Sequence, residues 1–294
     1  MRYAWIDEHR QDFPVAMLCR CLEVSRSGFY EWRSRGVSPR QERHDKLTSA
    51  AKDFHEASDS VYGYRKVYED LQELDDESMH CCPETVRGIM QENNLFSRVE
   101  RKQKWISTTD SHHTEPVAEN LLNRDFTASR PNEKWLTDMT FIETGEGWLY
   151  LAAVLDLFSR RVVGWAMDDN MQTQLVRRAL MMAIQHRLPE GQLLHHSDRG
   201  SQYASLEYRN LVDINEFTLS MSRKANCWDN APMESFFGSL KTEWLKFEDT
   251  RTREQAKQTT FEYIEVFYNR KRRHQSIDYK TPEAFEKLYY KNLN

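Results

Sequence analysis

Apolar residues recur at helical spacing through the first third of the chain. Between residues 13 and 32 this spacing predicts two short helices, with Ser25 able to cap the second. We therefore expect a small helix-turn-helix-like unit over residues 1–40. The polar stretch 33–43, which contains a glycine and a proline, predicts a linker.

A second helical region is predicted over residues 45–105. One helix opens near Tyr62, and Pro83 suits the first turn of another, because proline has no N–H to lose there. Such a pair is either a DNA-binding module or a packing module without DNA contacts, since helical pairs are common and few of them read DNA. A polar linker, residues 106–124, follows.

From residue 125 the pattern changes to strands. The predicted elements are strands at 135–142, 148–157 and 161–167, a helix at 174–186, a strand at 193–197, a helix at 206–212 and a strand at 217–221. The second strand is almost continuously apolar, which suits a sheet covered on both faces. With one further helix, this order predicts an α/β, ribonuclease-H-like core with a five-stranded mixed sheet over residues 125–250, followed by a helical basic extension, 251–294.

Composition narrows the class of protein. The chain has 294 residues, 30% of them charged and 39% hydrophobic, which is ordinary for a globular protein. No apolar run reaches the roughly 18 residues of a membrane helix. The acidic pair Asp7-Glu8 stands where a signal peptide would be apolar, so we expect a cytoplasmic protein.

The cysteines predict reduced thiols. Five cysteines form an odd set without the spacing of a secreted disulfide framework. Zinc is an alternative, because Cys81-Cys82 and His112-His113 are two ligand pairs. Each pair consists of adjacent residues, whereas zinc ligands usually stand two to four residues apart, so we do not expect a zinc site.

The distribution of charge matters more than its sum. A net charge of −5 disfavours a nucleic-acid partner, but basic residues gather at 98–104 and 270–274, and acidic ones at 75–77. Local positive patches on an acidic chain are compatible with DNA binding, since Lys and Arg release counterions from phosphates.

Three carboxylates stand in distinctive local sequences. Asp138 lies in KWLTDMT, Asp198 in HHSDRGSQY and Glu234 in WDNAPMES, and thirty-five residues separate the last two. On the predicted layout Asp138 lies in the first strand and Asp198 at the end of the fourth, where ligands bind in open α/β sheets. Glu234 falls in the first turn of the next helix, which Asp229 or Asn230 can cap. One aspartate alone is usually a solvated surface charge, so the hypothesis of a site rests on all three contexts together.

Together these segments resemble the DDE transposases and retroviral integrases, and most closely the OrfB-type transposases of the insertion-sequence-three family. The resemblance runs over nearly the whole chain, and residues 268–277 and 281–285 match the family's C-terminal signature. It implies a bacterial DNA transposase, a polynucleotidyl transferase that cleaves at insertion-sequence ends and joins the freed 3′-hydroxyl to another strand. It also implies association with the nucleoid when the protein is bound to DNA.

A metal site would resolve the repulsion among converging carboxylates. Mg²⁺ prefers oxygen ligands and is usually held by one or two protein carboxylates plus substrate phosphate oxygens. We predict two Mg²⁺ ions, which Mn²⁺ can replace, one held by Asp138 and Asp198 and the other by Asp138 and Glu234. The family supplies the identity of the bridging ligand. Asp156, which ends the second strand, is a rival that better suits a turn.

Candidate DNA contacts come from several polar groups. Lys241 lies seven residues after Glu234, about two turns along the same helical face, and the resemblance makes it a contact to the DNA end; an exposed helix lysine is the alternative. His196 and Ser197 are placed to orient Asp198. The other candidates are Arg199 and Gln202; Arg270, Lys271, Arg272, Arg273 and His274; Arg65, Lys66 and Arg87; and Arg101, Lys102 and Lys104. A charge run is otherwise usually a solvated helix end.

Two departures from the family pattern concern partners. Gly88 stands where the family tends to carry a basic residue, which implies one DNA contact fewer. The chain has no sustained heptads, whereas in the family an upstream-frame OrfA protein, often fused by frameshifting, supplies a leucine zipper. Expected partners are therefore double-stranded DNA, carrying terminal repeats or the target, an OrfA protein or fusion, and further copies of the chain, because two transposon ends must be brought together. No membrane partner is expected.

Two alternative functions use the same residues. A ribonuclease-H-like nuclease would hydrolyse DNA without joining it, and it differs in whether a 3′-hydroxyl can replace water as the nucleophile. A non-catalytic DNA-binding regulator derived from a transposase would keep the fold without the chemistry. The presence of all three carboxylates argues against the regulator.

Overall fold

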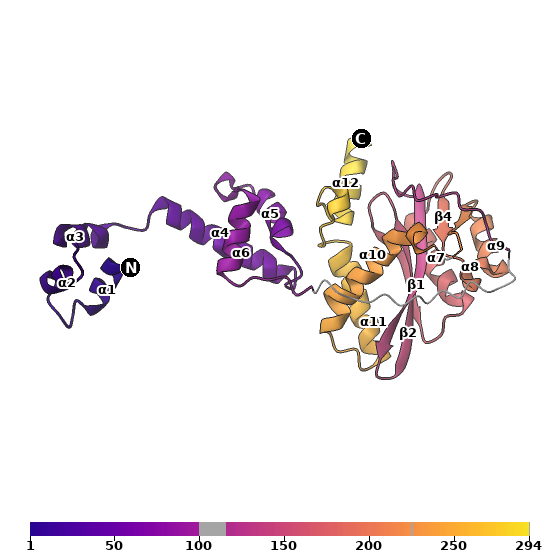
Figure 1. Ribbon diagram of the computed structural model, residues 1–294. Coiled ribbons are helices and arrows are strands. Elements are labelled where there is room, and N and C mark those ends of the chain that lie inside the picture. Colours follow the sequence, from indigo (N-terminus) through magenta and orange to yellow (C-terminus); the bar gives the residue numbers. More distant parts are fainter. Residues whose placement is uncertain (100–115, 225, 294) are drawn as a thin grey trace. The chain divides into compact units, whose positions relative to one another are not determined.

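The computed structural model describes residues 1–99, 116–224 and 226–293, which form two compact units. The first joins Met1–Ala57 with Tyr62–Phe96 and is helical, and the second joins Ser58–Val61 with Ser97–Asn294 and contains the sheet (Figure 1). Within the described ranges, no helix has both the length and the apolar character needed to cross a membrane.

The N-terminal part of the first unit consists of three short helices. These are α1 (Arg2–His9), α2 (Val15–Cys21) and α3 (Arg26–Ser34), packed around Ile6, Leu18, Cys19 and Phe29. The two predicted helices are confirmed, and Ser25 caps α3 by accepting a hydrogen bond from the Gly28 N–H at 3.2 Å. Helix α1 escaped prediction because it buries only one residue.

The rest of the first unit contains the predicted helical pair. Its elements are α4 (Pro39–Ala57), α5 (Tyr64–Gln72), a 3₁₀ turn (Glu77–Met79) and α6 (Pro83–Glu92). Pro83 lies in the first turn of α6 as predicted. The linker predicted at 33–43 is wrong over its second half, because Pro39 begins α4; proline is tolerated at a helix start as well as in a loop.

The second unit is built on a five-stranded mixed sheet, which confirms the predicted fold class. The strands are β1 (Lys134–Thr144), β2 (Gly147–Asp156), β3 (Val162–Asp168), β4 (Leu194–Ser197) and β5 (Thr218–Met221), in the order β3-β2-β1-β4-β5. The first three strands pair antiparallel, and β4 pairs parallel with both β1 and β5.

Helices complete this unit. They are α7 (Thr173–Arg187), α8 (Ser201–Ala204), α9 (Leu206–Ile214), α10 (Ala231–Ser239), α11 (Arg253–Phe261) and α12 (Pro282–Leu293). Shorter 3₁₀ turns span Cys227–Asn230, Leu245–Phe247 and Gln275–Ile277, and π-helical turns span Leu240–Trp244 and Glu262–Tyr268.

Helix α7 packs directly on β3 at Gly164. A Cβ atom there would lie 2.3 Å from the Ala179 carbonyl oxygen and 2.5 Å from the Ala183 nitrogen, so only glycine fits. The core around this contact includes Trp135, whose side chain is fully buried. The close approach fixes α7 against β3, in the same sheet whose strands β1 and β4 carry the site described below.

The predicted linker 106–124 is described only from residue 116. Residues 106–115 lie outside the described residues, and the following segment joins the core. The Leu121 and Leu122 N–H groups donate to the Ser220 hydroxyl, at 2.9 and 3.2 Å, and Leu122 is buried. The polar composition of the segment predicts a linker and gives no sign of these contacts with the core.

Candidate active site

The parallel pairing of β1 with β4 aligns the two aspartates. Lys134 pairs with Leu194 and Leu136 with His196. Continued by two residues along both segments, this register brings Asp138 level with Asp198, which directly follows β4. Neighbouring strands lie about 4.8 Å apart, so the two aspartates are neighbours across the interior strands β1 and β4.

Backbone N–H groups orient both carboxylates. The Asp138 Oδ1 atom accepts from the Met139 N–H at 2.8 Å, and the Asp198 Oδ1 atom accepts from the Gly200 N–H at 2.9 Å. Both side chains are half-buried. Each carboxylate therefore has one oxygen held by the protein backbone in this way.

Helix α10 supplies Glu234 in its first turn, with Pro232 close to the helix start, as predicted. The predicted cap is wrong: Asn230 stands at the N-cap position but makes no side-chain cap bond. Its Nδ2 atom instead donates to the Thr137 carbonyl oxygen at 3.2 Å, next to Asp138. Asn230 therefore ties the start of α10 to β1.

Asp229 is the centre of a hydrogen-bond network, here called the hub, and does not cap the helix. Its buried carboxylate accepts from the Arg223 guanidinium at 2.7 and 2.9 Å, from Arg124 at 2.9 Å and from Asn120 at 2.9 Å. These bonds, those of Arg223 first, hold the pKa of Asp229 well below its usual range. The hub fixes the 3₁₀ turn that leads into α10.

The carboxylates interact electrostatically. Burial raises the pKa of Asp138 well above its usual value, and the Asp198 and Glu234 charges raise it further, against the Met139 N–H and Lys241. Burial also raises the pKa of Glu234. The structure thus brings Asp138, Asp198 and Glu234 close enough for the charges of the last two to act on the first.

Lys241 is the cation beside this site. Its Nζ atom lies 4.6 Å from the centre of the Phe141 ring, burial lowers its pKa, and the Asp138 charge opposes that shift. The helix assumed in the sequence analysis is interrupted, because α10 ends at Ser239 and Lys241 lies in a π-helical turn. The contact with Phe141 had no signal in the sequence.

The donor set fits a hard divalent cation. All three side chains offer carboxylate oxygens, and their mutual repulsion leaves negative charge that Lys241 offsets only in part. Within the described residues, no three His, Cys, Asp or Glu side chains are arranged to hold one metal ion between them. An ion that takes two carboxylates, with water and substrate oxygens, needs no such cluster. Of the zinc alternative, His112 and His113 lie outside the described residues.

The histidines before Asp198 support the sheet instead of the carboxylate. His195 contacts the Tyr208 hydroxyl at 2.7 Å, and burial lowers its pKa to about 3. His196 contacts the Ser220 and Ser222 hydroxyls, and burial lowers its pKa to about 4. Both are neutral at physiological pH, so they add no charge to the site.

Asp156 behaves as the turn residue that the sequence suggested. Its buried carboxylate accepts from the Asn132 N–H at 2.7 Å and the Phe158 N–H at 2.8 Å, and Arg187 lies 3.6 Å away. Arg187 also pairs with Glu286 of α12, at 2.8 Å. The group is a structural network at the end of β2.

The two candidate DNA contacts after Asp198 have intramolecular partners. The Arg199 Nε atom donates to the Ser222 carbonyl oxygen, and the Gln202 Nε2 atom donates to the Met171 carbonyl oxygen at 2.8 Å. Both bonds fix the loop beside Asp198. Their contact with DNA stays a prediction.

The basic run 270–274 divides into exposed and buried members. Arg270 and Lys271 are exposed, whereas Arg273 and His274 are buried. Arg272 forms a buried ion pair with Glu243, with its Nε atom 2.6 Å from Oε2, and this partner raises its pKa against burial. The run is therefore partly a structural element.

The candidates in the helical pair lie on or near α5 and α6. Lys66 lies over the Tyr62 ring at 4.9 Å, Arg65 contacts the Tyr64 hydroxyl, and Arg87 pairs with Glu84 at 3.2 Å. The remaining candidates, Arg101, Lys102 and Lys104, lie outside the described residues.

Comparison with known proteins identifies the domains of the chain. Residues 42–103 match the model of an HTH-like domain, and residues 128–227 and 215–282 match two models described as integrase core domain. The core match includes Asp138 and Asp198, and the second match includes Glu234, Lys241 and the run 270–274.

Full-length relatives extend the match to nearly the whole chain. The chain is 40% identical over 273 residues to an insertion element IS600 uncharacterized 31 kDa protein of Shigella sonnei, which covers 93% of this chain and 98% of the relative. It is 39% identical over 288 residues to transposase InsF for insertion sequence IS3A of Escherichia coli strain K12, covering 97% and 98%. Among solved structures, an intasome of simian T-cell lymphotropic virus with PP2A regulatory subunit B56 gamma matches at 14% identity and a TM-score of 0.46, over 76% of this chain and 74% of that one. Because the chain is 39–40% identical to these two insertion-element proteins over nearly their full lengths, it belongs to the insertion-sequence-three family of transposases.

Proposed function

We propose that Asp138, Asp198 and Glu234 are the catalytic carboxylates of a metal-dependent reaction that cleaves DNA at insertion-sequence ends and joins the 3′-hydroxyl to a target strand. One observation carries the proposal: the register of β1 and β4 aligns the two aspartates. The charges of Asp198 and Glu234, which both raise the pKa of Asp138, support it. Integrase core membership supports the same class of chemistry.

Each residue has a distinct role in this proposal. Asp138 and Asp198 would hold one Mg²⁺, and Asp138 and Glu234 the other. Bound there, the two ions would activate the attacking oxygen and stabilise the leaving one. The Met139 and Gly200 N–H groups keep the two aspartates oriented, and Asn230 keeps α10 against β1. Lys241 would contact a phosphate at the DNA end.

DNA would also contact exposed basic side chains away from the carboxylates. Arg270 and Lys271 remain candidates on the second unit, and Arg65, Lys66 and Arg87 on the first, where the HTH-like match supports DNA binding. We further propose that copies of the chain assemble on paired DNA ends, with an OrfA protein or fusion as an additional partner.

The test combines metal, DNA and a conservative variant. The full chain is incubated with Mg²⁺ or Mn²⁺ and labelled duplex DNA carrying the element's terminal repeat, and wild type is compared with Glu234→Gln. We expect joined products that require metal and that fall by about 100-fold or more in the variant, the scale on which losing one electrostatic contact to a transition state acts.

The matched control is Glu190→Gln, which removes an exposed carboxylate of the same unit and should leave the products unchanged. Cleavage without joining would replace the transposase mechanism with that of a nuclease. Equal DNA binding by both proteins without any product would favour the regulator.

A further inference from the structure

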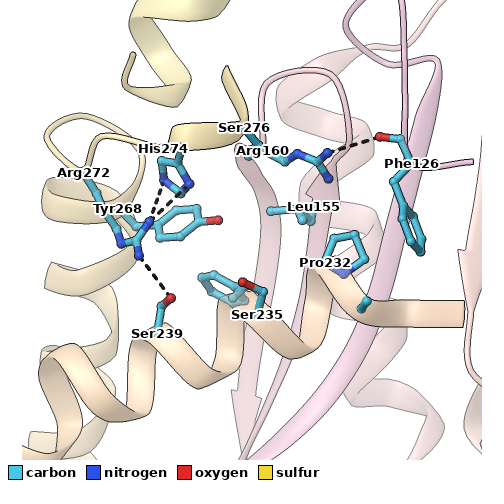
Figure 2. Close-up of a pocket in the computed structure, with 12 residues that line it drawn as sticks. Phe126, Leu155, Arg160, Pro232, Ser235, Ser239, Tyr268, Arg272, His274 and Ser276 are labelled. Atoms are coloured by element: carbon cyan, nitrogen blue, oxygen red, sulfur yellow. Dashed lines mark hydrogen bonds between the residues drawn. The ribbon is translucent and has the colours of Figure 1, made fainter. Parts of the chain in front are cut away.

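A cavity beside α10 is lined by basic and hydroxyl groups. It has a volume of about 280 Å³ and lies between α10, the turn after β2 and the segment after the second π-helical turn (Figure 2). Its polar lining comprises Arg160, Arg272, His274, Ser235, Ser239 and Ser276, together with Tyr268. None of the described residues that line it is Asp or Glu, so its chemistry suits an anion.

Arg160 contributes a positive charge that is not neutralised by an ion pair with any described carboxylate. Its Nη2 atom donates to the Phe126 carbonyl oxygen at 3.2 Å, and its buried Nε atom has no hydrogen-bond partner. Burial lowers its pKa. A buried donor without a partner is costly, and Arg160 is one of the residues that line the cavity. The backbone φ of 62° at Arg160 aims the side chain from a tight turn.

Arg272 forms the opposite wall and is already oriented. Glu243 holds one side of its guanidinium, and its Nη2 atom donates to the Ser239 hydroxyl at 3.2 Å. Its Nη1 atom lies 3.3 Å from the His274 ring (Figure 2). Because Glu243 balances Arg272, Arg160 is the cation of the wall without an ion-pair partner among the described carboxylates, and the nearby Asp156 charge partly offsets the effect of burial on its pKa.

We propose that this cavity, here called the α10 cavity, binds a phosphate group of the DNA backbone. Arginine and hydroxyl donors match phosphate oxygens, and about half or more of the hydrogen bonds in protein–DNA complexes go to phosphate and sugar. The volume lies just below the roughly 300 Å³ at which small-molecule sites begin, so it suits one phosphate with part of its sugar. The inference rests on the proposed function and extends it to a second phosphate site.

The position of the α10 cavity suits one duplex that also reaches the carboxylates. Ser235 and Ser239 are one helical turn apart and line the cavity (Figure 2). Glu234 directly precedes Ser235 in α10, so its side chain leaves the helix about 100° away from that of Ser235. The cavity and Glu234 therefore share helix α10.

The test measures DNA binding without metal, so that it does not depend on catalysis. The affinity of the full chain for terminal-repeat duplex is measured over a series of salt concentrations, in chelator, for wild type, Arg160→Gln and Arg160→Lys. Each phosphate contact contributes about 0.9 to the slope of log affinity against log salt. We expect the slope to fall by about 0.9 in Arg160→Gln and to be kept in Arg160→Lys.

The matched control is Arg251→Gln, which removes an equal charge from a side chain that is 85% exposed. Its slope should equal that of wild type. Ser235→Met tests the cavity independently, because it fills the space from an exposed position and keeps both arginines. It should weaken DNA binding even if Arg160→Gln fails to fold, which thermal unfolding would reveal.

Two outcomes would overturn the inference. The first is unchanged binding by folded Arg160→Gln and by Ser235→Met. The second is stabilisation of wild type, but not of Arg160→Gln, by inorganic phosphate while the DNA slopes stay equal, because the cavity would then serve free phosphate. The salt slopes measure DNA binding in chelator, whereas the Glu234→Gln comparison measures joined products with metal. Failure of the cavity proposal and failure of the proposed function are therefore distinguished.

Discussion

Burial raises the pKa of the Asp156 carboxyl to about 6, well above its usual range, despite two backbone N–H donors and the nearby Arg187. A carboxyl whose pKa rises on folding contributes stability that is complete below its unfolded pKa. That contribution is lost as pH rises through the folded pKa. Between pH 4 and pH 7 the wild-type fold should therefore lose stability through this group.

Asp156→Asn should remove this pH dependence. The amide cannot accept both N–H bonds, so the variant should be less stable than wild type at every pH, and most so near pH 4. The difference should shrink by about 1–3 kcal/mol by pH 7. Urea unfolding of both proteins across this range measures it, with exposed Asp213→Asn as the control. Parallel pH profiles for wild type and Asp156→Asn would contradict the assignment.

Single residues differ in how far the sequence revealed them. Asp138, Asp198 and Glu234 were found from their local sequences, and the structure brings them together. The local sequence predicts a cap at Asp229 or Asn230, because a position just before a helix is all that it offers. Its partners Arg124 and Asn120 lie more than a hundred residues earlier, so pattern could not reveal the hub.

At the scale of elements, the C-terminal basic run has two physical roles. Arg272 pairs with Glu243 of the first π-helical turn, while Arg270 is exposed a short distance away. Removing one member of a buried ion pair leaves the other charge uncompensated. The same substitution should therefore destabilise the fold at Arg272 but hardly affect its stability at Arg270.

Arg272→Gln should destabilise the second unit by about 3 kcal/mol, because Glu243 remains buried. Arg270→Gln should change stability by less than about 0.5 kcal/mol, since its side chain is exposed, and should weaken DNA binding. Urea unfolding and DNA titration in chelator measure the two effects. Equal loss of stability in both variants would show that the run is uniformly structural.

Strands were predicted more closely than the turns between helices. The continuous apolar run of β2 has few alternatives, so its predicted and observed bounds nearly coincide. The π-helical turns at Leu240–Trp244 and Glu262–Tyr268 were missed, because each is too short for its wider turn to be distinguished from α-helix by the spacing of apolar residues. The Tyr263 hydroxyl donates to the Glu243 carboxylate at 3.2 Å and so joins the two turns, and this tertiary contact has no local signature in the sequence.

The whole molecule has two compact units, each with its own buried side chains. The smaller unit contains Gly88, where an added Cβ would meet nothing within 4 Å. The larger contains Gly164, where it would meet the backbone of α7. Glycine is thus required at position 164 and is not required by packing at position 88.

Calorimetry of the full chain should show two transitions that respond separately to these glycines. Gly88→Ala should raise the transition of the first unit, stabilising it by about 0.5–1 kcal/mol, because alanine favours a helix interior. Gly164→Ala should lower the other transition, at a cost of about 1–3 kcal/mol or more from overpacking. A single transition that shifts in both variants would show that the units unfold together.

The hydrogen bonds that Arg187 donates to Glu286 also have a consequence for folding during synthesis. The two residues are ninety-nine positions apart in the sequence. Chains grow at about 5–20 residues per second, so a ribosome makes Arg187 and the carboxylates long before the partner that completes this end of the sheet. For several seconds the nascent sheet holds an arginine without its second carboxylate. The network of Asp156, Arg187 and Glu286 at the end of β2 is therefore completed only after α12 has been made.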